Sequence, residues 1–463
     1  MLFTSIDYLI FLTALFAVYW LVRIKHWQNL ILLAGSYFFY GYIHPWFCLL
    51  IAFSTVLDYS CGLGMIRWPR WKRGFLILSL VGNLGMLGTF KYFNFFAENV
   101  QTALSGLGFE FHPMTFEIFL PVGISFYTFQ TLSYTIDIYR GNFKPRTNFI
   151  DFAVFVSLFP QLVAGPVERA VRLLPQIESP RRWNWDLFAS AWPLLIRGYM
   201  KKMVIADNVA IYVDKIFMLE HPTLLLLAVG SLAFAVQIYA DFSGYTDIAR
   251  GSAKLIGFNL MENFRSPYLA ISPSDFWRRW HISFSSWIRD YLYIPLGGSR
   301  LAGRWRFALV LLTTMGLAGL WHGAAWNFVA WGIFHGTLVY AYHLLGMGGR
   351  WEPRHWQKKI VAWITMSFWT LIGWLLFRAP SLKWLLESLR GSADWNIDGQ
   401  ATTVAIVVLG LVGVYPIPLL VLLLLDRLTV KHAWAYALFY GLAVCAIFIF
   451  SRPGGQDFIY FQF

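Results

Sequence analysis

Phe307-Ala-Leu-Val-Leu-Leu-Thr-Thr-Met-Gly-Leu-Ala-Gly-Leu-Trp-His322 is an almost uninterrupted apolar stretch that ends in one ionisable side chain. Stretches of this kind form helices that cross the hydrocarbon of a bilayer. Gly316, Gly319 and the following Gly323 fall on one face of the predicted helix, which would let a neighbouring helix approach closely. His322 points away from that face. The stretch therefore predicts a membrane-spanning helix that carries a histidine.

Similar apolar runs recur from one end of the chain to the other. The 463 residues are 58% hydrophobic and only 13% charged, and no soluble domain of this size needs so much apolar surface. The segments of a transmembrane β-barrel would alternate in polarity and be about half as long. We therefore predict an all-α polytopic membrane protein with roughly 11–12 transmembrane helices. With no internal repeat and no low-complexity linker, residues 1–463 are expected to form a single domain.

Hydropathy and charge place the predicted membrane crossings along the chain. The expected spans are 5–22, 28–43, 46–66, 74–92, 116–138, 187–205, 223–241, 307–322, 326–345, 360–377, 403–425 and 434–451. Between them, 93–115 is expected to be a loop and 242–306 a longer, more polar stretch.

Basic residues gather in the short loops. The formal net charge is +13, which in a soluble protein would suggest nucleic acid as a partner. Here the positive-inside rule accounts for it, so no nucleic acid is expected. Arg23, Lys25 and the basic loop 67–73 should lie on the same side of the membrane. We therefore place these loops in the cytoplasm and both termini outside.

The cysteines and the N-terminus indicate no disulfide, metal site or cleaved leader. Cys48, Cys61 and Cys445 all fall in apolar segments without metal-ligand spacing. Residues 1–7 contain neither a basic region nor a small-residue cleavage site. We expect 5–22 to be a retained first helix.

One apolar segment, Phe152–Ala164, is too short to span the bilayer and has basic residues on both sides. We predict a re-entrant segment broken at Pro160 and at Gly165-Pro166. Non-helical backbone at membrane depth is tolerated only where protein or a water-filled cavity covers it. The segment therefore suggests a cavity that opens to the cytoplasm.

The polar stretch contains a second histidine of interest. Between Asp275 and Leu292, aromatic and apolar side chains recur at three- and four-residue intervals, which predicts one amphipathic helix at the cytoplasmic interface. The apolar stripe is Trp277, Trp280, Phe284, Trp287, Ile288 and Tyr291. His281 falls in this stripe and not among the arginines. It is either a core histidine bonded to a backbone carbonyl or a functional group, and both interpretations remain open.

Some of the remaining polar residues are functional candidates, and others are expected to serve packing. His322 is a functional candidate because ionisable groups inside membranes usually serve a function, although an interhelical hydrogen bond is the alternative. His335 shares a helix face with Asn327, Trp331 and Tyr342, which indicates polar packing. Asp241 and Asp247 could be ligands, but helix capping by Asp241 and Ser243 is the expected role.

A neutral imidazole is a good general base near neutral pH. Acyl transfer from a thioester to an alcohol needs a base, oriented reactants and the exclusion of water. It requires no metal and no bound redox cofactor, so none is expected here.

Five short motifs carry a resemblance to a known family. They are Val163-Ala-Gly-Pro-Val-Glu168, Asp241-Phe-Ser-Gly-Tyr-Thr-Asp-Ile-Ala-Arg-Gly251, Ser274-Asp-Phe-Trp-Arg-Arg-Trp-His-Ile-Ser283, Leu296-Gly-Gly-Ser299 and Trp321-His-Gly323. Together they resemble the membrane-bound O-acyltransferase family over most of the chain. The similarity is greatest to the bacterial branch that includes the alginate O-acetylation membrane protein and relatives acting on cellulose, peptidoglycan or teichoic acid.

The resemblance implies a fold, a site and a partner. His322 matches the family's catalytic histidine, and His281 matches a second polar position. The implied fold is a ring of transmembrane helices around a thinned centre, with a cytoplasmic funnel and a tunnel. The acyl group would come from a cytosolic thioester, either acetyl-CoA or an acyl-carrier protein. It would cross the membrane to an extracytoplasmic acetyltransferase partner.

We therefore expect an O-acyltransferase of the bacterial inner membrane that serves O-acetylation of an extracellular polysaccharide such as alginate or cellulose. Its catalytic residues would be His322 and His281. Candidate residues along the donor channel are Trp280, Arg278, Arg279, Trp321 and Asn327. The alternatives are a proton-coupled transporter or flippase and a non-catalytic scaffold of a polysaccharide export complex. The absence of repeats and of paired acidic residues in the membrane argues against a transporter.

Overall fold

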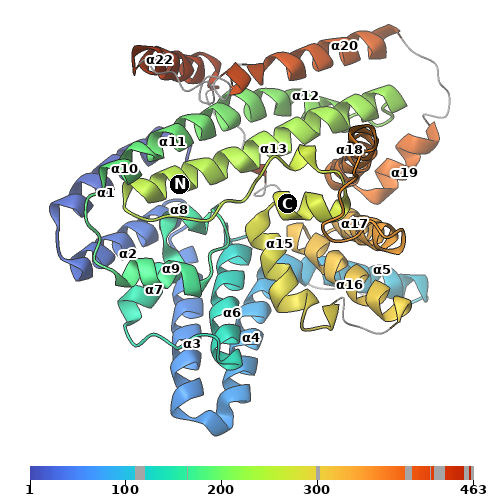
Figure 1. Ribbon diagram of the computed structural model, residues 1–463. Coiled ribbons are helices and arrows are strands. Elements are labelled where there is room, and N and C mark those ends of the chain that lie inside the picture. The colour runs from blue at the N-terminus through green and yellow to red at the C-terminus, as the bar shows by residue number, and fades with distance from the viewer. Residues whose placement is uncertain are drawn as a thin grey trace. The chain divides into compact units, whose positions relative to one another are not determined.

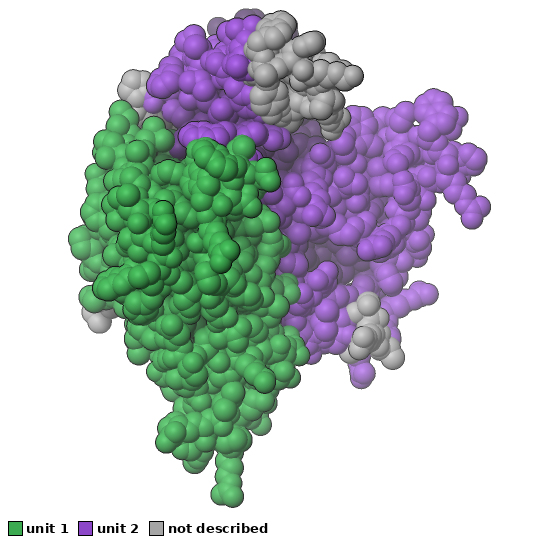
Figure 2. All heavy atoms as spheres, turned by 60° about the vertical axis from the view of Figure 1, so that its left-hand side comes forward, with its two compact units in different colours: residues 1–189, 252–261 green, residues 190–251, 262–463 purple. Residues whose placement is uncertain are grey.

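The computed structural model of the chain contains only helices as regular elements in the residues it describes (Figure 1). The described residues are 1–109, 120–163, 165–298, 303–391, 399–417, 419–421, 433–452 and 458–459. They form two compact units, drawn in different colours in Figure 2. Unit 1 comprises Met1–Ala189 and Ser252–Met261, and unit 2 comprises Ser190–Gly251 and Glu262–Phe463. The expectation of a single domain stays a prediction.

Unit 1 is built from helices that begin near the N-terminus. They are α1 (Ile6–Leu21), α2 (Lys25–Gly41), α3 (Phe47–Arg67), η1 (Pro69–Trp71), α4 (Lys72–Leu87), η2 (Gly88–Tyr92), α5 (Phe93–Gly106), α6 (Ile124–Arg140), α7 (Phe149–Ser157), α8 (Phe159–Leu162), α9 (Ala170–Glu178) and α10 (Trp185–Ala189).

Unit 2 contains the remaining helices. They are α11 (Ala191–Tyr199), η3 (Met200–Ala206), α12 (Asp207–Phe217), α13 (Leu224–Leu255, whose last turn falls in unit 1), η4 (Pro267–Leu269), α14 (Pro273–Arg279), α15 (Ile282–Ile288), η5 (Arg289–Tyr293), α16 (Arg304–His322), α17 (Trp326–Leu344), α18 (Trp356–Arg378), α19 (Leu382–Gly391), α20 (Gly399–Val414) and α22 (Ala433–Phe450).

Several of these helices fit a membrane. Within the described residues, five helical segments are long and apolar enough to cross a bilayer. They are Phe47–Arg67, Pro69–Gly106, Leu224–Leu255, Trp356–Arg378 and Gly399–Val421. The prediction of an all-α polytopic membrane protein is thereby confirmed, and the larger number of crossings stays a prediction.

Several predicted segment boundaries are wrong. Residues 93–106 do not form a loop, because α4 continues through the π-helical turn η2 into α5, which ends at Gly106. The part 110–115 lies outside the described residues. The span 223–241 is too short, because α13 runs on to Leu255. Hydropathy ends it at Asp241, but that carboxylate is neutralised by a lysine, as described below, so the helix continues.

The span predicted at 116–138 corresponds to α6, which begins only at Ile124. Pro121 and a left-handed Gly123 (φ 80°) precede it, and a residue with positive φ cannot continue a right-handed helix. Residues 116–119 lie outside the described residues.

The predicted re-entrant segment is broken, as expected, but not at Pro160. It forms the two short helices α7 and α8, and the chain turns at Leu158 (ψ 110°). Pro160 lies in the first turn of α8, where its missing N–H costs nothing. Both helices are buried apart from the first turn of α7. The second expected break is present, because α8 ends at Leu162 and Gly165-Pro166 belong to no helix. Ala164 lies outside the described residues.

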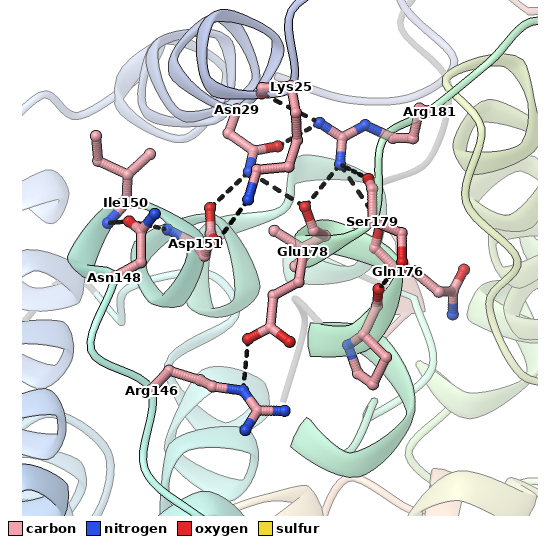
Figure 3. Close-up of polar contacts among 12 residues, drawn as sticks. Lys25, Asn29, Arg146, Asn148, Ile150, Asp151, Gln176, Glu178, Ser179 and Arg181 are labelled. Atoms are coloured by element: carbon pink, nitrogen blue, oxygen red, sulfur yellow. Dashed lines mark hydrogen bonds and ion pairs between the residues drawn. The ribbon is translucent and has the colours of Figure 1, made fainter.

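A polar network holds α7 and α9 to α2 inside unit 1 (Figure 3). Asp151 of α7 accepts from Asn29 (2.7 Å) and pairs with Lys25 (3.2 Å), both on α2. Arg181, which follows α9, donates to the side-chain oxygen of Asn29 and to the carbonyl of Ile177 (2.8 Å). Figure 3 shows these groups pointing toward one another between the three helices.

In unit 2, α16 and α17 pack at backbone contact. A Cβ added at Gly319 would lie 2.0 Å from the carbonyl oxygen of Phe328, and one at Gly332 would lie 2.1 Å from that of Met315. Glycine is therefore required on both sides of this interface. The close approach predicted from the glycine face of 307–323 is confirmed, and α17 is the helix that makes it.

Candidate active site

His281 lies in a turn between α14 and α15, so the single amphipathic helix predicted over 275–292 is wrong. The residue adopts a left-handed conformation (φ 42°, ψ 55°), which is uncommon for a side chain other than glycine and is often found at functional sites. The π-helical turn η5 then follows α15. Most of the aromatic stripe is nevertheless buried as expected: Trp280, Phe284, Trp287, Ile288 and Tyr291.

A distant segment of unit 2 holds this turn in place. The carbonyl of Asn263 accepts from the N–H of Ile282 (2.9 Å), and its side-chain oxygen accepts from the N–H of Ser283 (3.2 Å). The N–H of Arg265 donates to the carbonyl of Arg279 (3.0 Å). Asn263 is fully buried and caps α15 from outside the helix. The sequence gives no local signal for this role, because the two partners are 20 residues apart.

Two aromatic rings connect the two histidines. Phe284 and Trp321 stack with their ring centroids 4.2 Å apart. The ring of His281 lies 5.0 Å from Phe284 and 6.0 Å from Trp321. His322 lies 5.5 Å from Phe284 and 4.9 Å from Trp321. The two imidazoles therefore belong to one aromatic cluster, because each contacts both Phe284 and Trp321.

His322 ends α16 and is 3% exposed. Its other ring neighbours are Trp331 of α17 at 5.1 Å and Phe377 of α18 at 5.4 Å, both nearly perpendicular to it. With Phe284 of α15 and Trp321 of α16, aromatic rings from four helices of unit 2 thus surround this imidazole. Such an enclosure keeps water away from the imidazole.

His281 is held neutral. It is fully buried, and burial lowers its pKa from 6.5 to about 3. A buried imidazole loses more hydration free energy when charged than when neutral, which explains this direction. At neutral pH the residue is therefore a hydrogen-bonding group or a base and not a cation.

The other candidates occupy different surroundings. Trp280 is buried and lies 4.8 Å from Trp374 of α18. Arg279 donates to Asp275 (3.0 Å), and Arg278 donates to the carbonyl of Gly349 (2.6 Å) as well as to Asp275 (3.4 Å). Both guanidinium groups thus hold α14 in place.

Asn327 and His335 lie on the buried face of α17. The amide of Asn327 donates to the carbonyls of Ala379 (3.0 Å) and Phe377 (3.5 Å) at the C-terminal end of α18. His335 stacks on Phe276 (5.9 Å) and contacts Trp331 (4.9 Å). The predicted shared face is confirmed, since Asn327, Trp331, His335 and Tyr342 are all buried.

Sequence reasoning missed a buried ion triad in unit 2. Lys202 of η3 lies 2.7 Å from Asp207 and 2.7 Å from Asp241, and all three side chains are buried. Asp241 also accepts from the N–H of Ile459 (2.8 Å). Asp241 and Ser243 both lie inside α13, so the expected capping role is wrong. The signal was a lysine within the apolar run 187–205, where charges are rare unless paired.

The described residues contain no group of three or more His, Cys, Asp or Glu side chains arranged to hold a metal ion. The cluster contains the neutral imidazole of His281 and the buried imidazole of His322, and aromatic rings surround both. These are the requirements of base-assisted acyl transfer to an alcohol.

Comparison with known proteins gives independent evidence on the family. A model of the membrane-bound O-acyltransferase family matches residues 145–372. A probable alginate O-acetylase AlgI from Pseudomonas aeruginosa is 40% identical over 406 residues, which cover 86% of this chain and 76% of that protein. The chain belongs to the membrane-bound O-acyltransferase family. The matched range contains both histidines and all five motifs of the sequence analysis.

Other relatives of this membrane-bound O-acyltransferase have different polymers in their names. A peptidoglycan O-acetyltransferase from Helicobacter pylori is 34% identical over 79% of this chain and 73% of that protein. A teichoic acid D-alanyltransferase from Bacillus subtilis is 25% identical over 54% of this chain and 64% of that protein. The chain is therefore a multi-pass membrane enzyme that transfers acyl groups to oxygen.

Proposed function

We propose that this enzyme takes an acetyl group from a cytosolic thioester and passes it across the inner membrane for O-acetylation of an extracellular polysaccharide. Alginate is the favoured polymer, because the relatives named for alginate share 37–40% identity over 82% or more of the chain. The donor would be acetyl-CoA or an acyl-carrier protein. An extracytoplasmic acetyltransferase would receive the group, and both termini of this enzyme would lie outside.

His322 is the proposed general base. It takes the proton of the acceptor hydroxyl while that oxygen attacks the thioester carbonyl carbon. The carbon–sulfur bond then breaks, and the thiolate leaves with the proton that His322 returns. The observation that supports this role is the position of His322. It lies at the end of α16 and is surrounded by the rings of Trp321, Trp331 and Phe377.

His281 is proposed to orient the reactants beside it. Its left-handed turn is fixed from outside by Asn263, and it shares Phe284 and Trp321 with His322. Trp280, Arg278 and Arg279 would shape the approach of the donor mainly through the position of α14. The funnel and tunnel of the family remain part of this proposal.

The test is His322→Ala in a strain that lacks the native gene. We expect polymer acetylation to be lost while the amount of protein in the membrane is unchanged. His343→Ala is the matched control, since His343 is an exposed histidine on α17, and it should acetylate normally. Full acetylation by His322→Ala would show that another residue is the base.

A further inference from the structure

Unit 1 contains a polar ladder inside the bundle of α3, α4 and α6. Each helix contributes two side chains that are four residues apart and therefore lie on one face. The six residues are Ser54 and Asp58 of α3, Ser79 and Asn83 of α4, and Thr131 and Thr135 of α6. All six are fully buried. Two of these helices are among the segments able to cross a membrane.

Asp58 is the centre of the ladder. The hydroxyl of Ser79 donates to its Oδ1 (2.5 Å), and the amide of Asn83 donates to its Oδ2 (2.8 Å). Ser79 lies 2.9 Å from the hydroxyl of Thr135, and Ser54 donates to the oxygen of Asn83 (2.6 Å). Each partner in this network is neutral.

Within the described part of the chain, no lysine, arginine or histidine forms an ion pair with Asp58. Two titratable side chains near it are Cys61 of α3 and Tyr134 of α6, and neither can supply a positive charge. Of the other charged groups on the packed helices, Asp137 of α6 is a buried acid, and the rest are engaged elsewhere or exposed. Asp151 of α7 pairs with Lys25 of α2, Lys72 of α4 lies over the ring of Tyr139, and His26, Arg67, Arg70, Arg73 and Arg140 are exposed.

An ionised carboxylate without a counter-charge is very costly in an apolar bundle, and such groups usually become neutral. A carboxylic acid suits this site because it has one O–H to donate. Ser79 can accept that hydrogen bond and donate its own to Thr135, which donates to the carbonyl of Leu132 (3.2 Å). The hydrogen bonds then run in one direction from the acid to the backbone.

We propose that Asp58 is a proton-binding site, and that the folded protein carries it as a neutral carboxylic acid at neutral pH. Folding of unit 1 then takes up a proton from solution. Removal of the proton at alkaline pH leaves a negative charge between α3, α4 and α6 and loosens the bundle. This site is independent of the acyl-transfer residues, which lie in unit 2.

Asp58→Asn tests the site, and Asp151→Asn is the matched control. Both aspartates are buried in unit 1, but only Asp151 has a cationic partner. We expect Asp58→Asn in the full-length protein to unfold at the same temperature as the wild type or higher at neutral pH, with the advantage growing as pH rises. Asp151→Asn should unfold at a lower temperature. A clear loss of stability in Asp58→Asn that matches Asp151→Asn would overturn the proposal.

Infrared spectroscopy gives a second, direct measurement. The wild type should show the carbonyl band of a protonated carboxylic acid at neutral pH, and this band should be missing from Asp58→Asn and present in Asp151→Asn. A sodium ion is the alternative to the proton, because it would also bring one positive charge to Asp58. If sodium ions, at constant pH and ionic strength, raise the unfolding temperature of the wild type but not of Asp58→Asn, the site binds a metal cation and the proton assignment is wrong.

Discussion

Phe284 of α15 stacks on Trp321 of α16 with 4.2 Å between the ring centroids and 25° between the ring planes. The pair lies between the two candidate histidines, because His281 and His322 each contact both rings. A single stacking contact thus sets the position of two imidazoles that come from different helices.

Phe284→Ala should therefore damage both stability and activity. Removing a buried phenylalanine costs about 3–5 kcal/mol in the free energy of unfolding, and the imidazoles would lose their common wall. Phe284→Leu keeps most of the volume and should cost less. The measurements are thermal unfolding in detergent and the acetyl content of the polymer. Normal acetylation by a well-expressed Phe284→Ala protein would contradict this role of the ring.

His281 predicts how stability changes with pH. Its pKa is about 3 in the folded protein and 6.5 when exposed, so the unfolded chain binds more protons between these values. The contribution of His281 to the free energy of unfolding is therefore fully present above pH 6.5. It falls by about 1.4 kcal/mol for each pH unit of acidification below that value. His281→Asn should lack this component, whereas the exposed His343→Asn should retain it. Identical pH dependence in the wild type and His281→Asn would show that His281 is not held neutral.

Asn263 is expected to position His281. Asn263→Ala removes the acceptor for the N–H of Ser283, which should cost about 1–2 kcal/mol and release the left-handed turn. Acetylation should fall by more than the amount of folded protein does. Asn263→Asp keeps an oxygen at this place and should rescue part of the activity. The prediction is wrong if acetylation per folded molecule is unchanged in Asn263→Ala.

The packing of α16 on α17 gives a matched pair of glycine variants. The added methyl group of Gly319→Ala would lie 2.0 Å from the carbonyl oxygen of Phe328, so the helices must separate, whereas that of Gly316→Ala would meet Ile333 at an ordinary 3.7 Å. We expect Gly319→Ala to lower stability by about 1–3 kcal/mol or more and Gly316→Ala to be nearly neutral. Equal unfolding temperatures for the two variants would refute the close contact.

The buried triad of Lys202, Asp207 and Asp241 should be sensitive to loss of its cation. Lys202→Met leaves two buried carboxylates without a counter-charge, which costs about 3–5 kcal/mol. Lys201→Met is the neighbouring control. Its partner Asp247 is less buried and also lies 3.5 Å from Arg250. The free energy of unfolding should therefore fall clearly less in Lys201→Met than in Lys202→Met. Thermal unfolding of both variants at neutral pH measures the difference.

The membrane class of this protein, its long apolar helices and the close helix approach at the glycine face of 307–323 were predictable from the sequence alone. These properties depend on local hydropathy and on residues three or four positions apart, which a sequence displays directly. For the same reason the shared face of Asn327, Trp331 and His335 was predictable.

Where the helices break and which side chains meet depends on contacts between distant segments. The turn at His281 depends on Asn263, the continuation of α13 past Asp241 depends on Lys202, and the meeting of His281 with the surroundings of His322 depends on Phe284 and Trp321. Each of these contacts joins residues from separate segments. Their free energy can outweigh local periodicity, and it becomes visible only when the segments are packed together.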